Sequence, residues 1–167
     1  VQLQTVCANV VRAMPNLPAL IGESMSVLYA PTVTAKTRRE LDVLFSRIGR
    51  VAWVEDEAQL HAVTAISGSG PAYLFAFMAA LETAAMAQGL SADLARELVA
   101  QTIKGAGLLA SQSSEDVTTL RAQVTSKGGT THAALEILGA GDFDMLVMKA
   151  VQAACLRSET LATEKKN

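Results

Sequence analysis

Residues 124–138 place a glycine pair and several hydroxyl side chains at the start of an apolar-periodic stretch, and we call residues 124–131 the glycine corner. Gly128 and Gly129 allow a positive φ and a close approach of the backbone to a ligand. Three of its hydroxyl-bearing residues, Ser126, Thr130 and Thr131, are candidates for capping that helix. Their oxygen atoms can cap the free N–H groups of the helix that follows, and the positive end of that helix favours a small carboxylate or phosphate. The residues alone leave open a simpler interpretation, which is a capped helix after a turn.

Other residue types that often do chemistry are present without a catalytic or metal-binding pattern. His61 and His132 are the only histidines, and because neither lies in an HxxxH or HExxH spacing we expect no metal site. Residues 67–71, Ser-Gly-Ser-Gly-Pro, match neither a GxGxxG nor a Walker loop and follow a predicted helix, so they indicate a break between helices. Glu136, which lies within the helix after the glycine corner, is expected to point to solvent or to pair with a base.

A short strand is predicted over residues 6–13, where valines precede a turn at Met14, Pro15 and Asn16. Ligands in open α/β sheets gather beyond the carboxyl ends of strands, so this turn is a candidate border of a site. An ordinary proline turn explains the same residues, and both interpretations stay open.

The rest of the first 57 residues has the pattern of a strand crossover. Strands are predicted over 25–30 and 51–54, and between them a helix over 35–48 is capped by Thr34 and ends before Gly49. This order of elements predicts the closing part of an α/β sheet rather than a complete one.

From Glu57 onward the pattern is helical and no strand signal returns. The predicted helices cover residues 56–66, 72–88, 92–110, 114–123, 130–138 and 143–161. The helix over 72–88 is apolar nearly all round, and Gly105 and Gly107 each cost the next helix about 1 kcal/mol relative to alanine, which is easier to understand if another backbone packs against them. One small bundle has too little interior for these surfaces, so we expect a partner chain to bury them.

Composition and charge narrow the class of protein. Hydrophobic residues make up 50% of the 167 residues but aromatic residues only 4%, and the mean hydropathy is +0.29, which indicates closely packed, alanine-rich helices. The net charge is −2 with dispersed basic residues, so no nucleic-acid-binding stripe is expected. We expect no membrane span and no signal peptide, and hence a soluble, cytoplasmic protein. Cys7 and Cys155 form no CxxC pair and are expected to be buried free thiols, and the start at Val1 rather than Met indicates a fragment.

Three blocks of sequence, in this order and spacing, resemble pyrroline-5-carboxylate reductases. The blocks are VRAMPNLPAL at 11–20, SGSGPAY at 67–73 and VTSKGGTT at 124–131. The resemblance implies a mainly α chain, in which a helical dimerisation domain of the 6-phosphogluconate dehydrogenase C-terminal type follows the rear β-α-β part of a Rossmann domain. It divides the chain into residues 1–57, which lack the GxGxxG half of the nucleotide-binding domain, and residues 58–167, which dimerise and bind substrate.

The same resemblance implies an oxidoreductase that transfers a hydride from NADPH or NADH to the imine carbon of 1-pyrroline-5-carboxylate and so produces L-proline. The residues that it assigns to substrate binding are Ser126, Gly128, Gly129, Thr130 and Thr131. The Thr131 hydroxyl is then placed to hydrogen-bond the ring nitrogen as the catalytic group, and Met14, Pro15 and Asn16 lie beside the nicotinamide. The implied partner is a second copy of the chain, in a homodimer or an assembly of dimers.

Lys127 departs from the family pattern, because the family usually has proline at this place in the loop. The substitution gives the loop a charge and less rigidity. Two alternatives stay open: the 167 residues by themselves are a non-catalytic dimerisation and substrate-binding module, or the protein is another imine or hydroxyacid reductase with the same two-domain plan. The choice between NADPH and NADH also stays open, because the discriminating loop is absent from this sequence.

Overall fold

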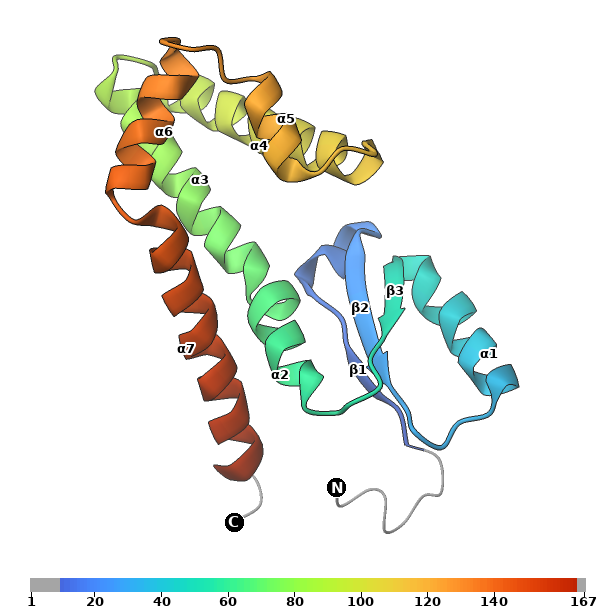
Figure 1. Ribbon diagram of the computed structural model, residues 1–167. Coiled ribbons are helices and arrows are strands. Elements are labelled where there is room, and N and C mark those ends of the chain that lie inside the picture. The colour runs from blue at the N-terminus through green and yellow to red at the C-terminus, as the bar shows by residue number, and fades with distance from the viewer. Residues whose placement is uncertain (1–9, 165–167) are drawn as a thin grey trace. The chain divides into compact units, whose positions relative to one another are not determined.

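The computed structural model describes residues 10–164 of the 167-residue chain, and the start of the predicted strand over 6–13 lies outside them, as does Cys7. The chain forms two compact units, drawn in Figure 1. The first unit contains residues up to Tyr73 together with the chain from Met148 onward, and the second runs from Leu74 to Val147. Each unit is described by itself.

A three-stranded sheet with the order β1-β2-β3 forms the centre of the first unit. Its strands are β1 (Arg12–Met14), β2 (Ser24–Tyr29) and β3 (Gly49–Trp53). The strands predicted over 25–30 and 51–54 are confirmed with shifted bounds, whereas β1 overlaps the predicted 6–13 only at residues 12 and 13 and includes Met14, which was predicted to lie in the turn. β1 pairs antiparallel with β2, whereas β2 and β3 are parallel and are joined through helix α1 (Ala35–Phe45). β1 pairs with the second half of β2, so its last residue, Met14, lies beside Val27 and the chain runs on from there toward the amino end of β2.

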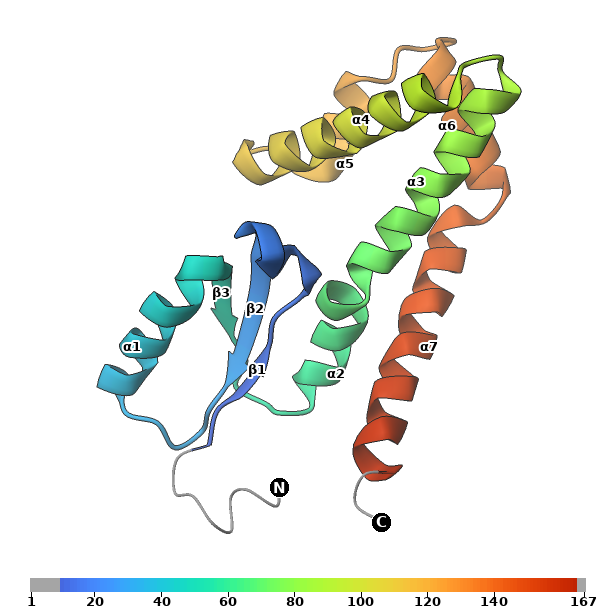
Figure 2. The same ribbon diagram turned by 180° about the vertical axis from the view of Figure 1, so that it is seen from behind.

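Helix α1 begins where the sequence indicated, because the Thr34 hydroxyl accepts a hydrogen bond from the Thr37 N–H at 3.2 Å. It ends at Phe45 rather than Ile48, since the last predicted turn tightens into a 3-10 helix, η3 (Ser46–Ile48). The indole N–H of Trp53 in β3 donates to a carboxylate oxygen of Asp42 in α1 at 2.7 Å, and this bond holds the helix against its side of the sheet. Helix α2 (Gln59–Val63) lies on the other side of the sheet (Figures 1 and 2).

The helix break predicted at residues 67–71 is confirmed only in part, because a π-helical turn ends at Gly68 and the next helix begins at Gly70, but the chain continues as one long helix. Helix α2, the π-helical turn η4 (Thr64–Gly68) and helix α3 (Gly70–Ala87) follow one another as a single helix over Gln59–Ala87. The helix accommodates the glycines and the proline of residues 67–71 through one wider, π-helical turn. In this turn the Ser69 N–H donates to the Thr64 carbonyl oxygen, five residues earlier, at 2.8 Å. Pro71 lies in the first turn of α3, as expected.

This helix corrects the expectation that no apolar segment is long enough for a membrane span. Gln59–Ala87 has 29 residues and contains an 18-residue window with a mean hydropathy of at least 1.2, so by length and composition alone it could cross a membrane. Core helices of soluble proteins meet the same two criteria. Length and composition therefore do not place this helix in a membrane.

The second unit is built from helices, and its last helix continues into the first unit. In chain order these helices are the main part of α3, α4 (Ala92–Gln112), α5 (Val117–Gln123), α6 (Thr130–Ala140) and the start of α7 (Phe143–Glu164). Ser91 caps α4 as predicted, accepting from the Leu94 N–H at 3.3 Å. The short α5 is capped by Asp116, so its start lies three residues later than the predicted 114.

Few apolar side chains of the long helices are buried within the chain. Neither α3 nor α6 nor α7 contains a buried residue, and in α4 only Ala95 and Val99 are buried. Leu74 and Phe75 of α3 are more than half exposed. This confirms that the chain's own interior is too small for its apolar surface. A Cβ added to Gly105 would meet no atom of the described chain within 4 Å, so no intrachain backbone explains that glycine.

Candidate functional site

The glycine corner begins with a tight turn over residues 126–129. The Gly129 N–H donates to the Ser126 carbonyl oxygen at 3.0 Å, and Gly128 has a φ of +72°. With Lys127 outside the positive-φ region, these values define a type II turn, whose third position requires glycine. The turn thus accounts for Gly128 and leaves Lys127 at the second position, which proline favours.

Helix α6 starts directly after this turn, with Gly129 as its N-cap residue. No side chain caps it, so the prediction that the hydroxyls of Ser126, Thr130 or Thr131 do so is wrong. The reason is that glycine occupies the capping position and offers only its backbone. The first N–H groups of α6 consequently keep their hydrogen-bonding capacity for an anion.

The hydroxyl side chains of the corner differ in their surroundings. Ser126 and Thr130 are exposed, whereas Thr131 is half-buried. Thr131 lines an apolar pocket of about 610 Å³ in the second unit, together with Val124, Leu135 and side chains of α3, α4 and α5. Thr131 is therefore the one of these three hydroxyls that lines an apolar pocket, where a polar atom needs a partner.

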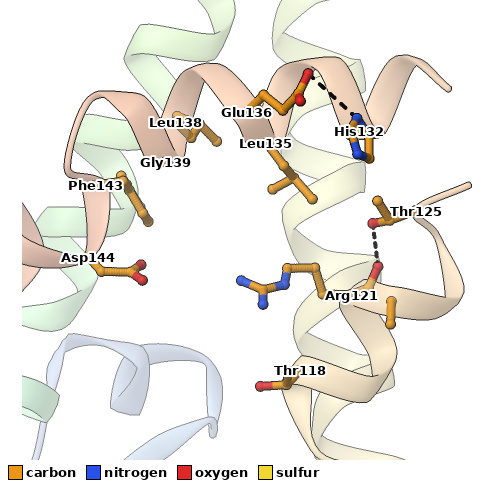
Figure 3. A pocket seen from close by; sticks show the side chains of 11 residues that line it. Thr118, Arg121, Thr125, His132, Leu135, Glu136, Leu138, Gly139, Phe143 and Asp144 are labelled. Atoms are coloured by element: carbon orange, nitrogen blue, oxygen red, sulfur yellow. Dashed lines mark hydrogen bonds and ion pairs between the residues drawn. The ribbon is translucent and has the colours of Figure 1, made fainter. Parts of the chain in front are cut away.

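A second pocket of about 640 Å³ lies between α5, α6 and the start of α7 (Figure 3). The Arg121 side chain extends into it and forms no ion pair with any residue in the described range. Across the pocket, Glu136 lies 3.6 Å from Nδ1 of His132, which confirms that Glu136 pairs with a base. Asp144 also lines the pocket, which therefore contains acidic side chains as well as Arg121.

Arg121 lines this pocket, and the sequence patterns did not single it out. The guanidinium group lies in the last turn of α5, and the Thr125 hydroxyl donates to the Arg121 carbonyl oxygen at 2.6 Å, directly before the turn of the glycine corner. A cation three residues before a predicted anion corner is the signal that could have identified it.

The turn after β1 contacts the Ser-Gly-Ser-Gly-Pro segment in the first unit. The side-chain N–H of Asn16 donates to the Ser67 carbonyl oxygen at 3.1 Å and to the Ser67 hydroxyl at 3.4 Å. A Cβ on Gly68 would lie 2.5 Å from the Met14 methyl group. Pro15, which lies between Met14 and Asn16 in the sequence, is exposed. Two of the three sequence blocks therefore meet at one place, while the glycine corner belongs to the other unit.

The remaining candidate groups do not assemble into a further site. Between residues 10 and 164 no three His, Cys, Asp or Glu side chains are grouped as they would be around a metal ion. His61 is bonded through Nδ1 to the Ser158 hydroxyl at 2.9 Å, which ties α2 to α7 within the first unit. Cys155 is free, but it is half-buried rather than buried as expected.

These elements define a class of protein in which the last strands of a nucleotide-binding type of sheet lead into a helical dimerisation domain. The sequence pattern described as "Pyrroline-5-carboxylate reductase dimerisation" matches residues 57–161. The chain therefore belongs to the pyrroline-5-carboxylate reductase family, whose members are oxidoreductases.

Individual relatives agree with this assignment. The chain is 43% identical over 157 residues to a pyrroline-5-carboxylate reductase of Haemophilus influenzae, with 93% of this chain and 58% of the relative covered. Against the reductase of Pseudomonas aeruginosa the identity is 45% over 156 residues, covering 93% and 57%. The chain thus spans little more than half the length of these relatives.

Solved structures show the same fold. The reductase of Coxiella burnetii superimposes with a TM-score of 0.89 at 39% identity, covering 92% of this chain and 57% of that one. A pyrroline carboxylate reductase of Plasmodium falciparum with NADP bound gives a TM-score of 0.85 at 34% identity, covering 95% and 65%. These structures confirm a helical domain after part of a Rossmann domain.

Proposed function

We propose that the protein to which this chain belongs reduces 1-pyrroline-5-carboxylate to L-proline with NADPH or NADH, the last step of proline biosynthesis. The observation that carries the proposal is the start of α6, where a type II turn delivers N–H groups without a side-chain cap. A substrate with one carboxylate fits such a helix start, since the helix dipole and the free amides both favour an anion. Family membership supports the same substrate.

In this proposal the glycine corner holds the substrate. The N–H groups of Gly128 and Thr130 bind the carboxylate, whereas the Gly129 N–H, also predicted to bind it, is held by the Ser126 carbonyl oxygen within the turn. Ser126 adds an exposed hydroxyl at the edge. The half-buried Thr131 hydroxyl hydrogen-bonds the ring nitrogen and, directly or through a water molecule, supplies the proton that the nitrogen gains. Protonation makes the C=N carbon a better hydride acceptor, so the proton and the hydride together give the saturated ring of proline.

The bound nicotinamide would supply the hydride, and this chain would contribute only one border of its site. Met14 and the exposed Pro15 remain available for that border. Asn16 fits the predicted contact less well, because both ends of its side-chain amide are already hydrogen-bonded within the chain. The phosphate-binding GxGxxG loop is not part of this sequence.

The exposed apolar helices and membership of a dimerisation family support a homodimer, or an assembly of dimers, as the partner arrangement in this proposal. We propose residues 58–167 as the dimerising and substrate-binding domain, residues 1–57 as the rear of the nucleotide-binding domain, and the cytoplasm as its location. The second candidate is that the 167 residues alone form a non-catalytic module, because they lack the nucleotide-binding half.

The decisive test is proline formation from pyrroline-5-carboxylate and NADPH or NADH. It is made with a protein that carries this chain behind a complete nucleotide-binding half, which we call the full-length protein. Turnover is expected there and not in the 167-residue chain. A full-length protein that binds the cofactor but forms no proline would contradict the proposed function. Profiling with other cyclic imines and 2-oxo acids separates this reductase from others of the same two-domain plan.

A further inference from the structure

Pro71 leaves a carbonyl oxygen of the long helix without its usual donor. In an α-helix the N–H of each residue bonds the carbonyl four residues earlier, and for Pro71 that carbonyl belongs to Ser67. Proline has no N–H, so this bond cannot form. The Ser67 carbonyl oxygen instead accepts a hydrogen bond from Nδ2 of Asn16, 3.1 Å away and 51 residues earlier in the chain.

The other end of the Asn16 side chain is also held by a hydrogen bond. Its Oδ1 accepts from the Met25 N–H at 3.0 Å, and its backbone N–H donates to the buried Ser24 hydroxyl at 3.3 Å. The Ser67 hydroxyl adds a second link between the same segments by donating to the Met25 carbonyl oxygen at 3.4 Å. One side-chain amide therefore joins β2 to the π-helical turn η4, and every polar atom of that amide has a partner.

The same bonds set the spacing between β1 and η4. Gly68 approaches Met14 so closely that a Cβ on residue 68 would lie 2.5 Å from the Met14 methyl group. A hydrogen bond on one side and a close contact on the other hold the two segments in one arrangement. Met14 and Gly68 thus form one continuous surface at the carboxyl end of β1.

We propose that Asn16 is a positioning residue, which fastens the end of β1 to the π-helical turn and so fixes the surface formed by Met14, Pro15 and Gly68. This rests on the proposed function, in which that surface borders the nicotinamide. Asn16 acts through its neighbours, because its amide has no polar atom left for the cofactor.

Two substitutions in the full-length protein test this. Asn16→Ala removes both side-chain bonds, and we expect kcat/KM to fall about 10- to 100-fold through misplacement of the reacting groups, with KM for NADPH rising more than KM for the carboxylate substrate. Ser46→Ala is the matched control, because its hydroxyl donates to the Val43 carbonyl in an exposed turn of the same unit. The control should keep the wild-type constants.

Asn16→Asp adds a readout that general loss of stability would not produce. The introduced carboxylate can still accept from the Met25 N–H, but it faces the Ser67 carbonyl oxygen where a donor is needed, which raises its pKa. Protonation of the introduced carboxyl in the Asn16→Asp variant restores the donor. The ratio of variant to wild-type activity should therefore increase as the pH is lowered from about 8 to about 5.5. Two other charged residues adjoin this site: Glu23, just before β2, and Arg50, opposite Met25 in β3. Both are present in the variant and in the wild type, so their titration cancels in the activity ratio.

Amide hydrogen exchange at Met25 makes the test independent of turnover. Its N–H donates to Asn16 Oδ1, and exchange should accelerate about tenfold or more in Asn16→Ala relative to Ser46→Ala. Wild-type exchange at Met25, or an Asn16→Asp ratio that does not change with pH, would overturn the positioning role. Should both Asn16 variants fail to fold, Ser67→Ala must raise KM for NADPH about 2- to 5-fold, and a wild-type value overturns the proposal. Absence of proline formation in the wild-type protein counts against the proposed function only.

Discussion

The Ser126 hydroxyl occupies the space that a side chain on Gly129 would need, and the Ser126 carbonyl oxygen would lie 3.2 Å from a Cβ placed there. The two residues are the first and last of the type II turn and are joined by the 3.0 Å hydrogen bond from the Gly129 N–H. The close approach of Ser126 and Gly129 therefore sets the direction in which the first amides of α6 point.

Gly129→Ala is expected to displace Ser126 and tilt those amides. The φ of Gly129 is −80°, so alanine fits the backbone and the effect comes from crowding alone. We predict a rise of about tenfold in KM for pyrroline-5-carboxylate, equivalent to about 1.4 kcal/mol, with a smaller effect on thermal stability. In the double variant with Ser126→Ala, which removes the crowding hydroxyl, most of the lost stability should return. A double variant no more stable than Gly129→Ala would show that crowding by the hydroxyl is not the cause.

Lys127→Pro should stabilise the protein. Lys127 holds the second position of the type II turn, where proline is already in the required conformation, and its N–H donates to no acceptor among the described residues. The expected gain is about 0.4–1 kcal/mol in the free energy of unfolding, from a less flexible unfolded chain. Chemical denaturation of wild type, Lys127→Pro and Lys127→Ala measures it. A gain shared equally by the alanine variant would point to the loss of charge instead of the turn.

Thr131→Val tests the proposed proton donor with little change of shape. Valine keeps the packing in the 610 Å³ pocket but has no hydroxyl, so turnover should fall about 10²-fold while unfolding is little affected. Thr131→Ser, which keeps a hydroxyl, should retain most of the activity. Steady-state kinetics of the full-length protein gives kcat for both, and an unchanged kcat in the valine variant removes Thr131 from the mechanism.

Asp116 gives the start of α5 a dependence on pH. The backbone N–H of Thr119 donates to its carboxylate at 2.8 Å and holds the pKa of Asp116 below its usual value of 3.8. A lowered folded-state pKa means that the stabilisation is complete above the unfolded value and is lost as the pH falls through the folded value. Measured by NMR, the Asp116 carboxyl should titrate below 3.8. Asp116→Asn, an equally good cap, should keep α5 folded without this acid transition.

The sequence predicted most elements because their signals are local. Thr34 and Ser91 cap their helices with their own hydroxyls, and residues within one turn decide such a start. The π-helical turn could not be predicted from local sequence. The donor that bonds the Ser67 carbonyl oxygen in place of the missing Pro71 N–H belongs to Asn16, which is far away in the sequence. The capping of α6 was mispredicted for a related reason: three hydroxyls were available, yet the turn put Gly129 in the capping position. Residue types predicted the glycine corner as a candidate site, whereas its hydrogen bonds depend on how the chain folds in three dimensions.

The exposed apolar surface of α3 has a consequence for how the protein folds. In the proposed homodimer a second copy covers α3, which has no buried residue in its own chain, so folding and association of the helical domain would be coupled. Its melting temperature then has no single value and rises with protein concentration. For such a dimer, the amount of protein present in a cell would itself determine how much of it is folded.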